Sequence, residues 1–336
     1  MIAAAAALRV ERLSVEFRTR SGLVRALDNV SFSVRKGETI ALVGESGSGK
    51  SVTAYAIMGI LDPAGRVTNG QAMFGEIDLL AASRKQLAAV RGRQISMIFQ
   101  NPRTALNPIR PVGRQIADVL VRHGRVPARE APQQAVEMLR AVGISDPARR
   151  ASGYPFEMSG GMCQRVMIAI ALAAKPSLLI ADEPTTGLDV TTQAVIMDLI
   201  ADFATQRGMA TIFITHDLAL ASQRATRIVV MHAGHVVENA PTLDLCTQPR
   251  HPYTAELVAA TPDSAAKLDD LAAIPGSLPD LRRTDLPPCR YSERCPRKTE
   301  LCSQSLPLTA VGPEHIVACW NPLPVHAPLK LAIGAS

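Results

Sequence analysis

Short apolar runs bounded by polar or glycine-bearing turns are the clearest pattern along the chain. Four of them have the length of buried parallel strands, and three lead on to a stretch with helical spacing. Strands joined by helical crossovers predict a doubly wound α/β fold with a parallel core sheet. The four runs are Thr39–Val43, Ile95–Phe99, Leu178–Ala181 and Ala210–Ile214.

Alternation of apolar and polar residues predicts a second kind of strand on both sides of these runs. Leu8–Phe17 and Ala26–Val34 alternate as half-exposed antiparallel strands, with Ser21-Gly22 near the turn. Downstream, Arg227–Met231 and Val236–Glu238 flank Ala233-Gly234-His235 as a hairpin.

Two long segments complete the organisation. The insert between the second and third core strands, roughly Asn101 to Pro176, has a mainly helical pattern and is expected to form its own lobe. Beyond Pro249 proline becomes frequent and periodicity fades, which predicts an appendage. The longest apolar run, Val166–Ala174, is half of what a membrane-spanning helix requires, and Met1–Leu8 lacks the basic segment and cleavage site of a secretory signal.

Composition and charge are those of a globular protein. The 336 residues are 47% hydrophobic and 20% charged, with a net charge of +6 and a pI near 9.2. The basic residues are dispersed, which favours compositional bias over a nucleic-acid surface; a mildly basic face would also suit an anionic membrane leaflet.

A glycine-rich loop with the phosphate-binding pattern follows the first core strand and precedes a helix. Glycines let backbone N–H groups turn toward phosphates, the lysine is expected to reach the β and γ phosphates, and the last serine to bind Mg²⁺. The alternative is a tight glycine turn before a helix. The expected ATP-binding residues here are Gly44, Ser46, Gly47, Ser48, Gly49, Lys50 and Ser51.

Two adjacent carboxylates, Asp182 and Glu183, follow the strand Leu178–Ala181. The first suits Mg²⁺ and the second suits an attacking water. An isolated Asp-Glu pair is more often a turn or a helix start. Together with the phosphate loop, the pair predicts nucleotide hydrolysis.

The run Met158-Ser159-Gly160-Gly161-Met162-Cys163-Gln164-Arg165 resembles the signature motif of the ATP-binding cassette (ABC) family. The phosphate loop, Gln100, the signature, the acidic pair, Gly187-Leu188-Asp189 and Thr215-His216-Asp217 occur in the family's order over residues 8 to 240. The resemblance implies an ABC ATPase with a RecA-like parallel core sheet, an antiparallel N-terminal β subdomain and a helical signature subdomain. It places the nucleotide-binding domain at 8–248, with the helical subdomain at about 101–176.

The resemblance also implies roles for residues. Two such ATPases face head to tail, so that the signature of one, with Ser159, Gly160, Gly161, Gln164 and Asp189, closes over the partner's ATP. Glu183, His216 and Gln100 would be catalytic, Phe17 would stack on adenine, and Ser51, Gln100 and Asp182 would surround Mg²⁺. For Phe17 a place in the core is nearly as good an interpretation. Met158 and Cys163 depart from the family's usual leucine and polar or basic residue.

The C-terminal tail resembles one subgroup of the ABC family in particular. Pro249-Arg250-His251-Pro252-Tyr253-Thr254 resembles the C-terminal extension of oligopeptide and dipeptide importer ATPases, here 249–325. Four cysteines, Cys289, Cys295, Cys302 and Cys319, could bind zinc or a four-iron, four-sulfur (4Fe-4S) cluster, and the resemblance favours the cluster. The alternative is four free buried thiols. Cys163 and Cys246 are expected to be packing or surface residues.

By resemblance, the chain is expected to energise peptide import at the cytoplasmic face of a bacterial inner membrane, as a peripheral subunit using ATP and Mg²⁺. Its expected partners are a second, paralogous ATPase subunit, two transmembrane permease subunits and, indirectly, a substrate-binding protein, with no nucleic acid. The segment Asn101 to Arg150, including Arg110 and Arg114, is the expected docking surface for the permease.

Other functions stay open at this point. The same motor could serve nickel, glutathione, oligosaccharide derivatives or plant-tumour metabolites as cargo. A DNA-maintenance ATPase of the same fold would separate the phosphate loop and signature by hundreds of residues, or insert zinc modules within the cassette. A translation factor of this fold would carry two cassettes, and this chain has one.

Overall fold

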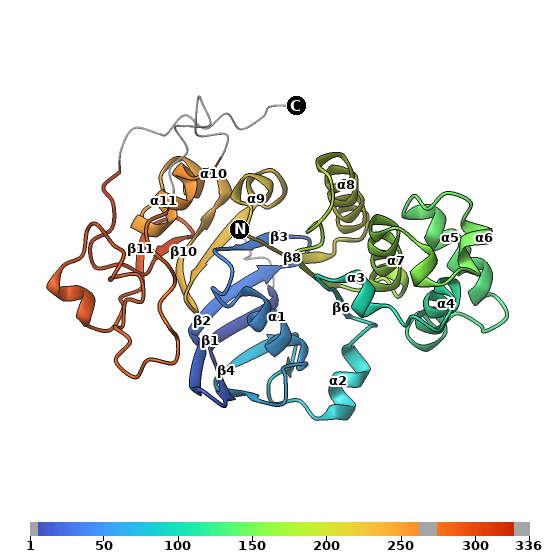
Figure 1. Cartoon of the computed structure of the whole chain (residues 1–336), viewed down its shortest axis with the longest axis horizontal. Coiled ribbons are helices and arrows are strands. Elements are labelled where there is room, and N and C mark those ends of the chain that lie inside the picture. Colours follow the sequence, from blue (N-terminus) through green and yellow to red (C-terminus); the bar gives the residue numbers. More distant parts are fainter. Residues whose placement is uncertain (1–5, 262–273, 326–336) are drawn as a thin grey trace. The chain divides into compact units, whose positions relative to one another are not determined.

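The computed structural model describes residues 6–261 and 274–325 (Figure 1). The chain falls into two compact units. Among described residues, one unit comprises 6–7, 35–38 and 82–212, and the other comprises 8–34, 39–81, 213–261 and 274–325. We call them the helical unit and the phosphate-loop unit.

The phosphate-loop unit contains an antiparallel sheet with the strand order β2-β1-β4-β5. Its first two strands are the predicted alternating ones, whose apolar side chains are buried on one face. The third and fourth strands were not predicted from the sequence. Their bounds are β1 (Ala6–Thr19), β2 (Gly22–Arg35), β4 (Gly65–Phe74) and β5 (Ile77–Asp78).

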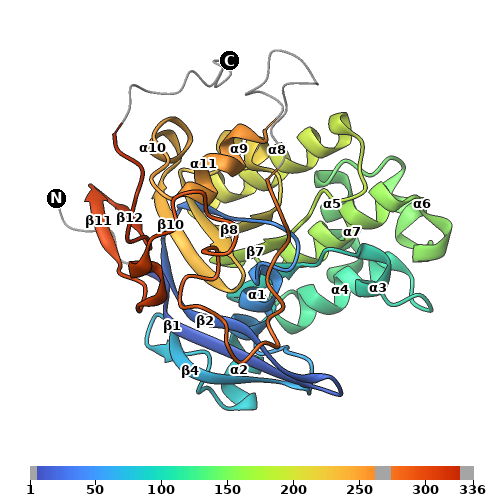
Figure 2. The same cartoon turned by 60° about the vertical axis from the view of Figure 1, so that its left-hand side comes forward.

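A second set of strands in this unit runs from the core to the appendage. The wholly apolar end of β3 (Thr39–Val43) pairs in parallel with β9 (Arg227–His232). From there β10, β12 and β11 add on successively in antiparallel pairs, and Figure 2 shows β12 and β11 beside β10. Their bounds are β10 (His235–Pro241), β11 (Thr309–Gly312) and β12 (His315–Val317).

The predicted hairpin is confirmed and has a two-residue turn. His232 pairs with His235, and the turn residues Ala233 and Gly234 have φ of 47° and 84°. Positive φ at both central residues is the geometry that matches the twist of paired strands.

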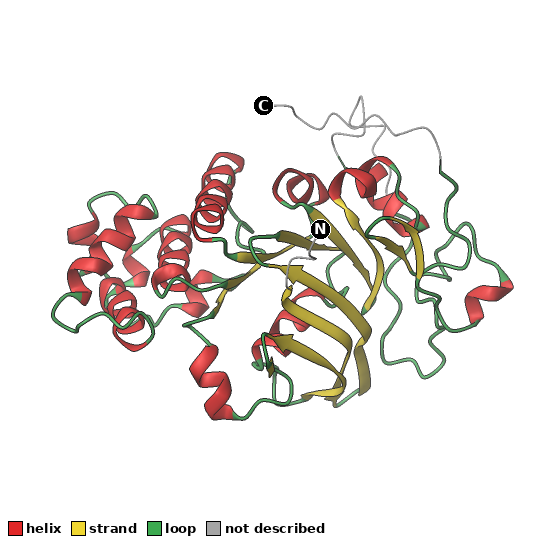
Figure 3. Ribbon diagram, turned by 180° about the vertical axis from the view of Figure 1, so that it is seen from behind, coloured by secondary structure: helices red, strands yellow, loops and turns green. Residues whose placement is uncertain are grey.

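Helices of the phosphate-loop unit begin and end at the residues expected from helix chemistry. Helix α9 is capped by Asp217, whose carboxylate accepts from the Leu220 amide at 2.9 Å, and α11 has Pro252 in its first turn. The appendage after α11 is mainly loop (Figure 3). The helices are α1 (Lys50–Met58), α9 (Leu218–Arg224), α10 (Thr242–Thr247), α11 (Pro252–Ala259) and the 3-10 helix η4 (Glu300–Ser303).

The helical unit contains two parallel strands, β6 (Ile95–Ile98) and β7 (Leu178–Asp182), and the predicted insert of helices between them. Three helices pack with one another: α4 (Val112–Arg122), α5 (Ala131–Ala141) and α6 (Pro147–Ala151). Helices α4 and α5 also contact α7 (Gly160–Ala173), whose side chains are mostly buried. The chain leaves this unit within β8 (Ala210–Thr215). The expected mixed α/β fold is therefore confirmed.

The helices of this unit are α2 (Arg84–Val90), α3 (Pro102–Ala105), α4 (Val112–Arg122), α5 (Ala131–Ala141), α6 (Pro147–Ala151), η1 (Pro155–Glu157), α7 (Gly160–Ala173) and α8 (Val190–Arg207). Across the described ranges of both units, no helix combines the length and apolarity needed to cross a membrane.

Candidate functional site

The phosphate loop lies between β3 and α1, as its sequence pattern requires. Gly47 and Gly49 have φ of 82° and 103°, a region that glycine enters without strain, and Gly49 caps α1. Gly44 is held closely: a Cβ there would lie 2.1 Å from the Met231 carbonyl oxygen. Ser48 is fully buried, whereas Ser46 is exposed.

Lys50 lies inside this loop and is 4% exposed. Its Nζ donates to the carbonyl oxygens of Gly44 at 2.7 Å and Glu45 at 2.9 Å, and to Ser48 Oγ at 3.4 Å. The ammonium therefore sits where the loop's backbone curves around it. Ser51, on the first turn of α1, is half-buried.

Gln100 and Glu183 form a direct pair in the helical unit. Gln100 Nε2 donates to Glu183 Oε2 at 2.9 Å, and Thr186 Oγ1 donates to the same oxygen at 2.9 Å. Glu183 is half-buried and has φ of 45°, a conformation that non-glycine residues seldom adopt. Asp182, directly before it at the end of β7, is fully buried. The carboxylate of Glu183 is thus oriented by two donors.

The signature residues form the N-terminus of α7. Ser159 caps the helix, its Oγ accepting from the Met162 amide at 3.3 Å, and a Cβ on Gly160 would meet nothing within 4 Å. Gln164 is buried and donates to the Pro184 carbonyl, which ties the helix to the segment after Glu183. Exposed backbone at the start of a 14-residue helix suits an anion.

The two departures from the family pattern lie in the protein interior. Met158 is 5% exposed, and Cys163 is fully buried, with its Sγ donating to the Pro155 carbonyl at 3.3 Å. Burial raises the pKa of the Cys163 thiol. Cys246 is also buried and its pKa is raised to about 11, so both isolated cysteines are packing residues.

Three further predicted residues lie at element ends. Asp189 caps α8, accepting from the Thr192 amide at 2.9 Å and its hydroxyl at 2.7 Å; these hydrogen bonds lower the pKa of its carboxyl. His216 is exposed directly after β8. Phe17, half-buried at the end of β1, lies over Gly65 of β4, where a Cβ would come within 2.6 Å of the ring.

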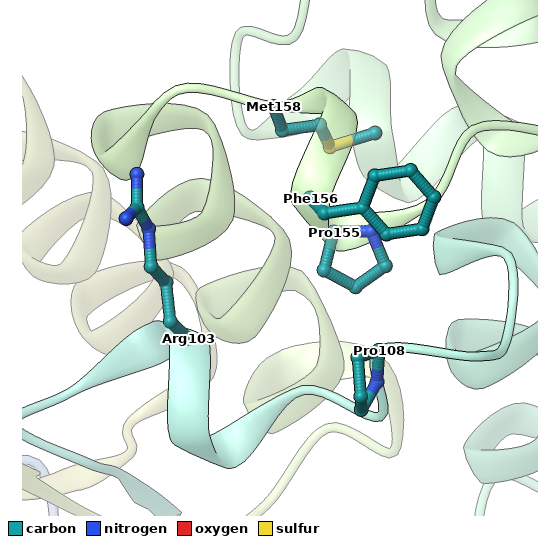
Figure 4. A pocket seen from close by; sticks show the side chains of 5 residues that line it. All are labelled: Arg103, Pro108, Pro155, Phe156 and Met158. Atoms are coloured by element: carbon teal, nitrogen blue, oxygen red, sulfur yellow. The ribbon is translucent and has the colours of Figure 1, made fainter.

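A pocket of about 260 Å³ opens on the helical unit, between the loop after β6 and the segment before α7. Figure 4 shows the lining side chains, of which Phe156 is 74% exposed. Its five lining residues are Arg103, Pro108, Pro155, Phe156 and Met158. Ile109, which follows the lining residue Pro108 in the sequence, is 82% exposed, so the unit presents two strongly exposed apolar side chains in these segments.

The expected metal site in the tail is not supported by the structure. Across residues 6–261 and 274–325, no group of three or more His, Cys, Asp or Glu side chains is arranged to hold a metal ion. Three of the four cysteines are buried and Cys295 is half-buried. Burial raises the pKa of Cys289 to about 11 and also raises those of Cys295 and Cys319.

Sequence reasoning missed the residues that join the appendage to the rest of its unit. Glu238 is fully buried and accepts from the amides of Arg250 and His251 and from His315 Nε2. Arg294 reaches Glu45 of the phosphate loop. The tail motif around His251 is the sequence signal that could have pointed to the contacts of Glu238. No local sequence signal points to the contact between Arg294 and Glu45.

Comparison with known proteins agrees with these motifs. The family model "ABC transporter" matches residues 27–186, and "Oligopeptide/dipeptide transporter, C-terminal region" matches residues 237–302. The probable peptide ABC transporter ATP-binding protein y4tR of Sinorhizobium fredii is 47% identical over 317 residues, 94% of each chain. The dipeptide transport ATP-binding protein DppD of Escherichia coli is 46% identical over 303 residues, 90% of this chain and 92% of its own.

A solved structure is similar as well. The ATP-binding cassette MJ0796, in a dimeric post-hydrolysis state bound to ADP and Pi, superposes with a TM-score of 0.64 at 27% identity, covering 70% of this chain and 98% of its own. The chain belongs to the ATP-binding subunits of ABC transporters and carries a C-terminal region of the oligopeptide/dipeptide type.

Proposed function

We propose that this chain hydrolyses ATP to drive the import of di- and oligopeptides, as a peripheral subunit on the cytoplasmic face of a bacterial inner membrane. The observation that carries the proposal is the C-terminal region, residues 237–302, which matches the oligopeptide/dipeptide type. Relatives named for dipeptide transport are 44% and 46% identical over nearly the whole chain. Nickel, glutathione or a sugar derivative is the alternative cargo.

In the proposed reaction Glu183 accepts a proton from the attacking water, or orients it. Gln100 Nε2 and Thr186 Oγ1 both donate to Glu183 Oε2, which orients the carboxylate for this role. Lys50, the loop amides and His216 would stabilise the charge on the γ-phosphate. Ser51 and Asp182 would each be a ligand of Mg²⁺, an ion that neutralises developing charge in phosphoryl transfer. Phe17 stacks on the adenine ring.

The signature at α7 completes the site of a second ATPase subunit, which we propose is a paralogue. Ser159, Gly160 and Gly161 stand at a helix N-terminus with open space beside Gly160, as contact with a partner's γ-phosphate requires. Gln164 and Asp189 then act by holding α7 and α8 in place, since both are engaged in hydrogen bonds within the unit.

The permease subunits are proposed to dock on the helical unit at the pocket beside Phe156. Exposed apolar side chains around a pocket mark interaction surfaces. A short cytoplasmic helix of the permease, with one apolar side chain in the pocket, is the expected occupant. Arg110 pairs with Asp118 at 2.6 Å on the same unit, and charge reversal at Arg110 and Arg114 is expected to uncouple hydrolysis from transport.

The docking proposal is tested by Phe156→Asp in the reconstituted transporter, with Leu308→Asp as the control because Leu308 is 72% exposed but lies in the appendage. We expect the first variant to lose transport while the isolated chain still binds ATP, and the second to transport normally. Equal transport by both variants would refute the docking site.

The four tail cysteines retain the donor chemistry of a 4Fe-4S or zinc site, although their arrangement does not form one. Each sulfur accepts a backbone N–H: Cys302 from Thr299 at 3.5 Å, Cys319 from Asn321 at 3.4 Å, and the other two from the residue two positions on. Such donors stabilise thiolates. We propose that the four cysteines bind a 4Fe-4S cluster, which would cross-link the tail. Iron, sulfide and zinc analysis of the anaerobically purified protein and its Cys302→Ser variant distinguishes a cluster, a zinc ion and free thiols.

Cargo is tested with the co-purified complex, including the permease subunits and a substrate-binding protein loaded with dipeptide, oligopeptide or nickel. We expect peptide-loaded binding protein to stimulate ATP hydrolysis, and Glu183→Gln to lower the rate by about a hundredfold or more. Stimulation by nickel alone would replace the peptide assignment. Undiminished hydrolysis in Glu183→Gln would refute the role of Glu183.

A further inference from the structure

The appendage contacts the phosphate loop itself, through an ion pair between Arg294 and Glu45. Arg294 Nη1 lies 3.0 Å from Glu45 Oε1 and 3.3 Å from Oε2, and Nη2 lies 3.3 Å from Oε2. The Arg294 side chain is 6% exposed and that of Glu45 is 28% exposed. A forked, largely buried contact of this kind is stronger and more specific than a surface ion pair.

The backbone of Glu45 is held from a second direction. Its amide donates to the Tyr253 hydroxyl at 3.1 Å, and Tyr253, on α11, is fully buried. The Glu45 carbonyl oxygen accepts from Lys50 Nζ and from the Ser48 amide, the latter at 3.1 Å. Donors and acceptors from α1, α11 and the appendage therefore fix this residue, which is the second position of the loop.

Arg294 is itself fixed, so it can transmit order to the loop. Its Nε donates to the Pro275 carbonyl at 2.7 Å, its Nη1 lies 3.2 Å from His232 Nε2, and its guanidinium lies 5.7 Å from the Tyr291 ring centre. Three residues on from Pro275, Leu278 lies against the loop, since a Cβ on Gly47 would come 3.3 Å from its Cδ1.

We propose that Arg294 is a positioning residue for ATP binding. It neutralises the carboxylate of Glu45 and holds the phosphate loop in the form that admits the triphosphate. An acidic residue in a loop that binds polyphosphate opposes binding unless its charge is paired. The appendage thereby becomes part of the nucleotide site. The inference rests on the phosphate loop binding ATP and is independent of the transported cargo.

The test measures equilibrium binding of a fluorescent ATP analogue with Mg²⁺ to the full-length chain. For Arg294→Ala we expect the Kd to rise about tenfold, equivalent to about 1.4 kcal/mol. The double variant Glu45→Gln with Arg294→Ala is expected to return to within about threefold of the wild type, because the unpaired charge is gone. Arg283→Ala is the control, since Arg283 pairs with Asp285 and Glu293 within the appendage.

The outcomes separate positioning from folding and from the proposed function. An unchanged Kd in Arg294→Ala, or a double variant as weak as Arg294→Ala, overturns the inference. If Arg294→Ala does not fold, Arg294→Gln takes its place, because glutamine keeps two donors without the charge. We expect the same tenfold rise in Kd for this variant, and a wild-type Kd would likewise overturn the inference. Absence of binding by the wild type would instead refute nucleotide binding at the loop.

Discussion

Replacing Glu238 with alanine tests how strongly the appendage is anchored. The carboxylate is fully buried in β10 and accepts three hydrogen bonds: from the amides of Arg250 at 2.7 Å and His251 at 2.8 Å, and from His315 Nε2 at 2.7 Å. Bonds to a charged acceptor contribute about 1.5–3 kcal/mol each, and donors left unpaired in the interior add to the loss. Because such terms are not additive, we expect a loss of about 4 kcal/mol in the free energy of unfolding.

The chain offers its own reporter for this measurement. Trp320 is the single tryptophan of the sequence and lies in the appendage, so its fluorescence during urea denaturation follows that region. A loss of about 4 kcal/mol is expected to lower the urea midpoint by about 1–2 M. Glu238→Gln keeps one acceptor and is expected to lose about half as much. The control is Glu137→Ala on the exposed face of α5. A midpoint for Glu238→Ala equal to that of the control would refute the anchoring role.

Three further predictions follow from single contacts. Gly65→Ala would place a Cβ 2.6 Å from the Phe17 ring, so we expect the ring to be displaced. Fluorescence titration should then show a Kd for ATP that is about fivefold weaker. An unchanged Kd would argue that Phe17 is a core residue. Gln100→Ala removes a donor to Glu183, and we expect kcat for ATP hydrolysis to fall about tenfold or more at unchanged KM; a change in KM alone would contradict this. Burial lowers the pKa of His251 to about 4, and its Nδ1 accepts from the Tyr253 amide, so the native state holds a neutral ring while the unfolded state takes up a proton near pH 6.5. Stability is therefore expected to fall by a few kcal/mol between about pH 6.5 and pH 4, and His251→Gln should flatten that slope in urea titrations; an equal slope in the variant would exclude His251 as its source.

The parts of the fold that the sequence predicts are those specified by local pattern. The apolar runs and alternating strands appear where expected, as do the hairpin at Ala233-Gly234 and the helical insert. Strand β4 was missed because Thr68-Asn69-Gly70-Gln71 interrupts the alternation of apolar and polar residues. This segment forms a strand because it pairs with β1. The short strands β11 and β12 carry too few residues for any period to show.

The missed functional contacts share a different cause. Arg294 and Glu45 are separated by 249 positions, and Glu238 and His315 by 77. No periodicity or motif spacing links residues so far apart. Glu238 is hidden further by an irregularity: the register shifts between Val236 and Glu238, so Val237 and Glu238 are both buried although strict alternation would expose one of them. The same limit applies to the tail cysteines, whose clustering in the sequence and family resemblance predicted a metal site without specifying how the sulfurs are arranged.

The contacts of the appendage argue against treating it as a separable module of this subunit. Strand β12 covers the edge of β10, and the Ala318 amide donates to the Val237 carbonyl at 2.8 Å. Arg290 is 4% exposed and donates to the Ala233 and Arg25 carbonyls, one on the turn after β9 and the other on β2. If the buried guanidinium left, the carbonyls of this turn and of β2 would both lose their hydrogen-bond donor, so the turn, the strand and the tail gain order together. The tail that marks the peptide-importer type is therefore built into the unit that carries the phosphate loop.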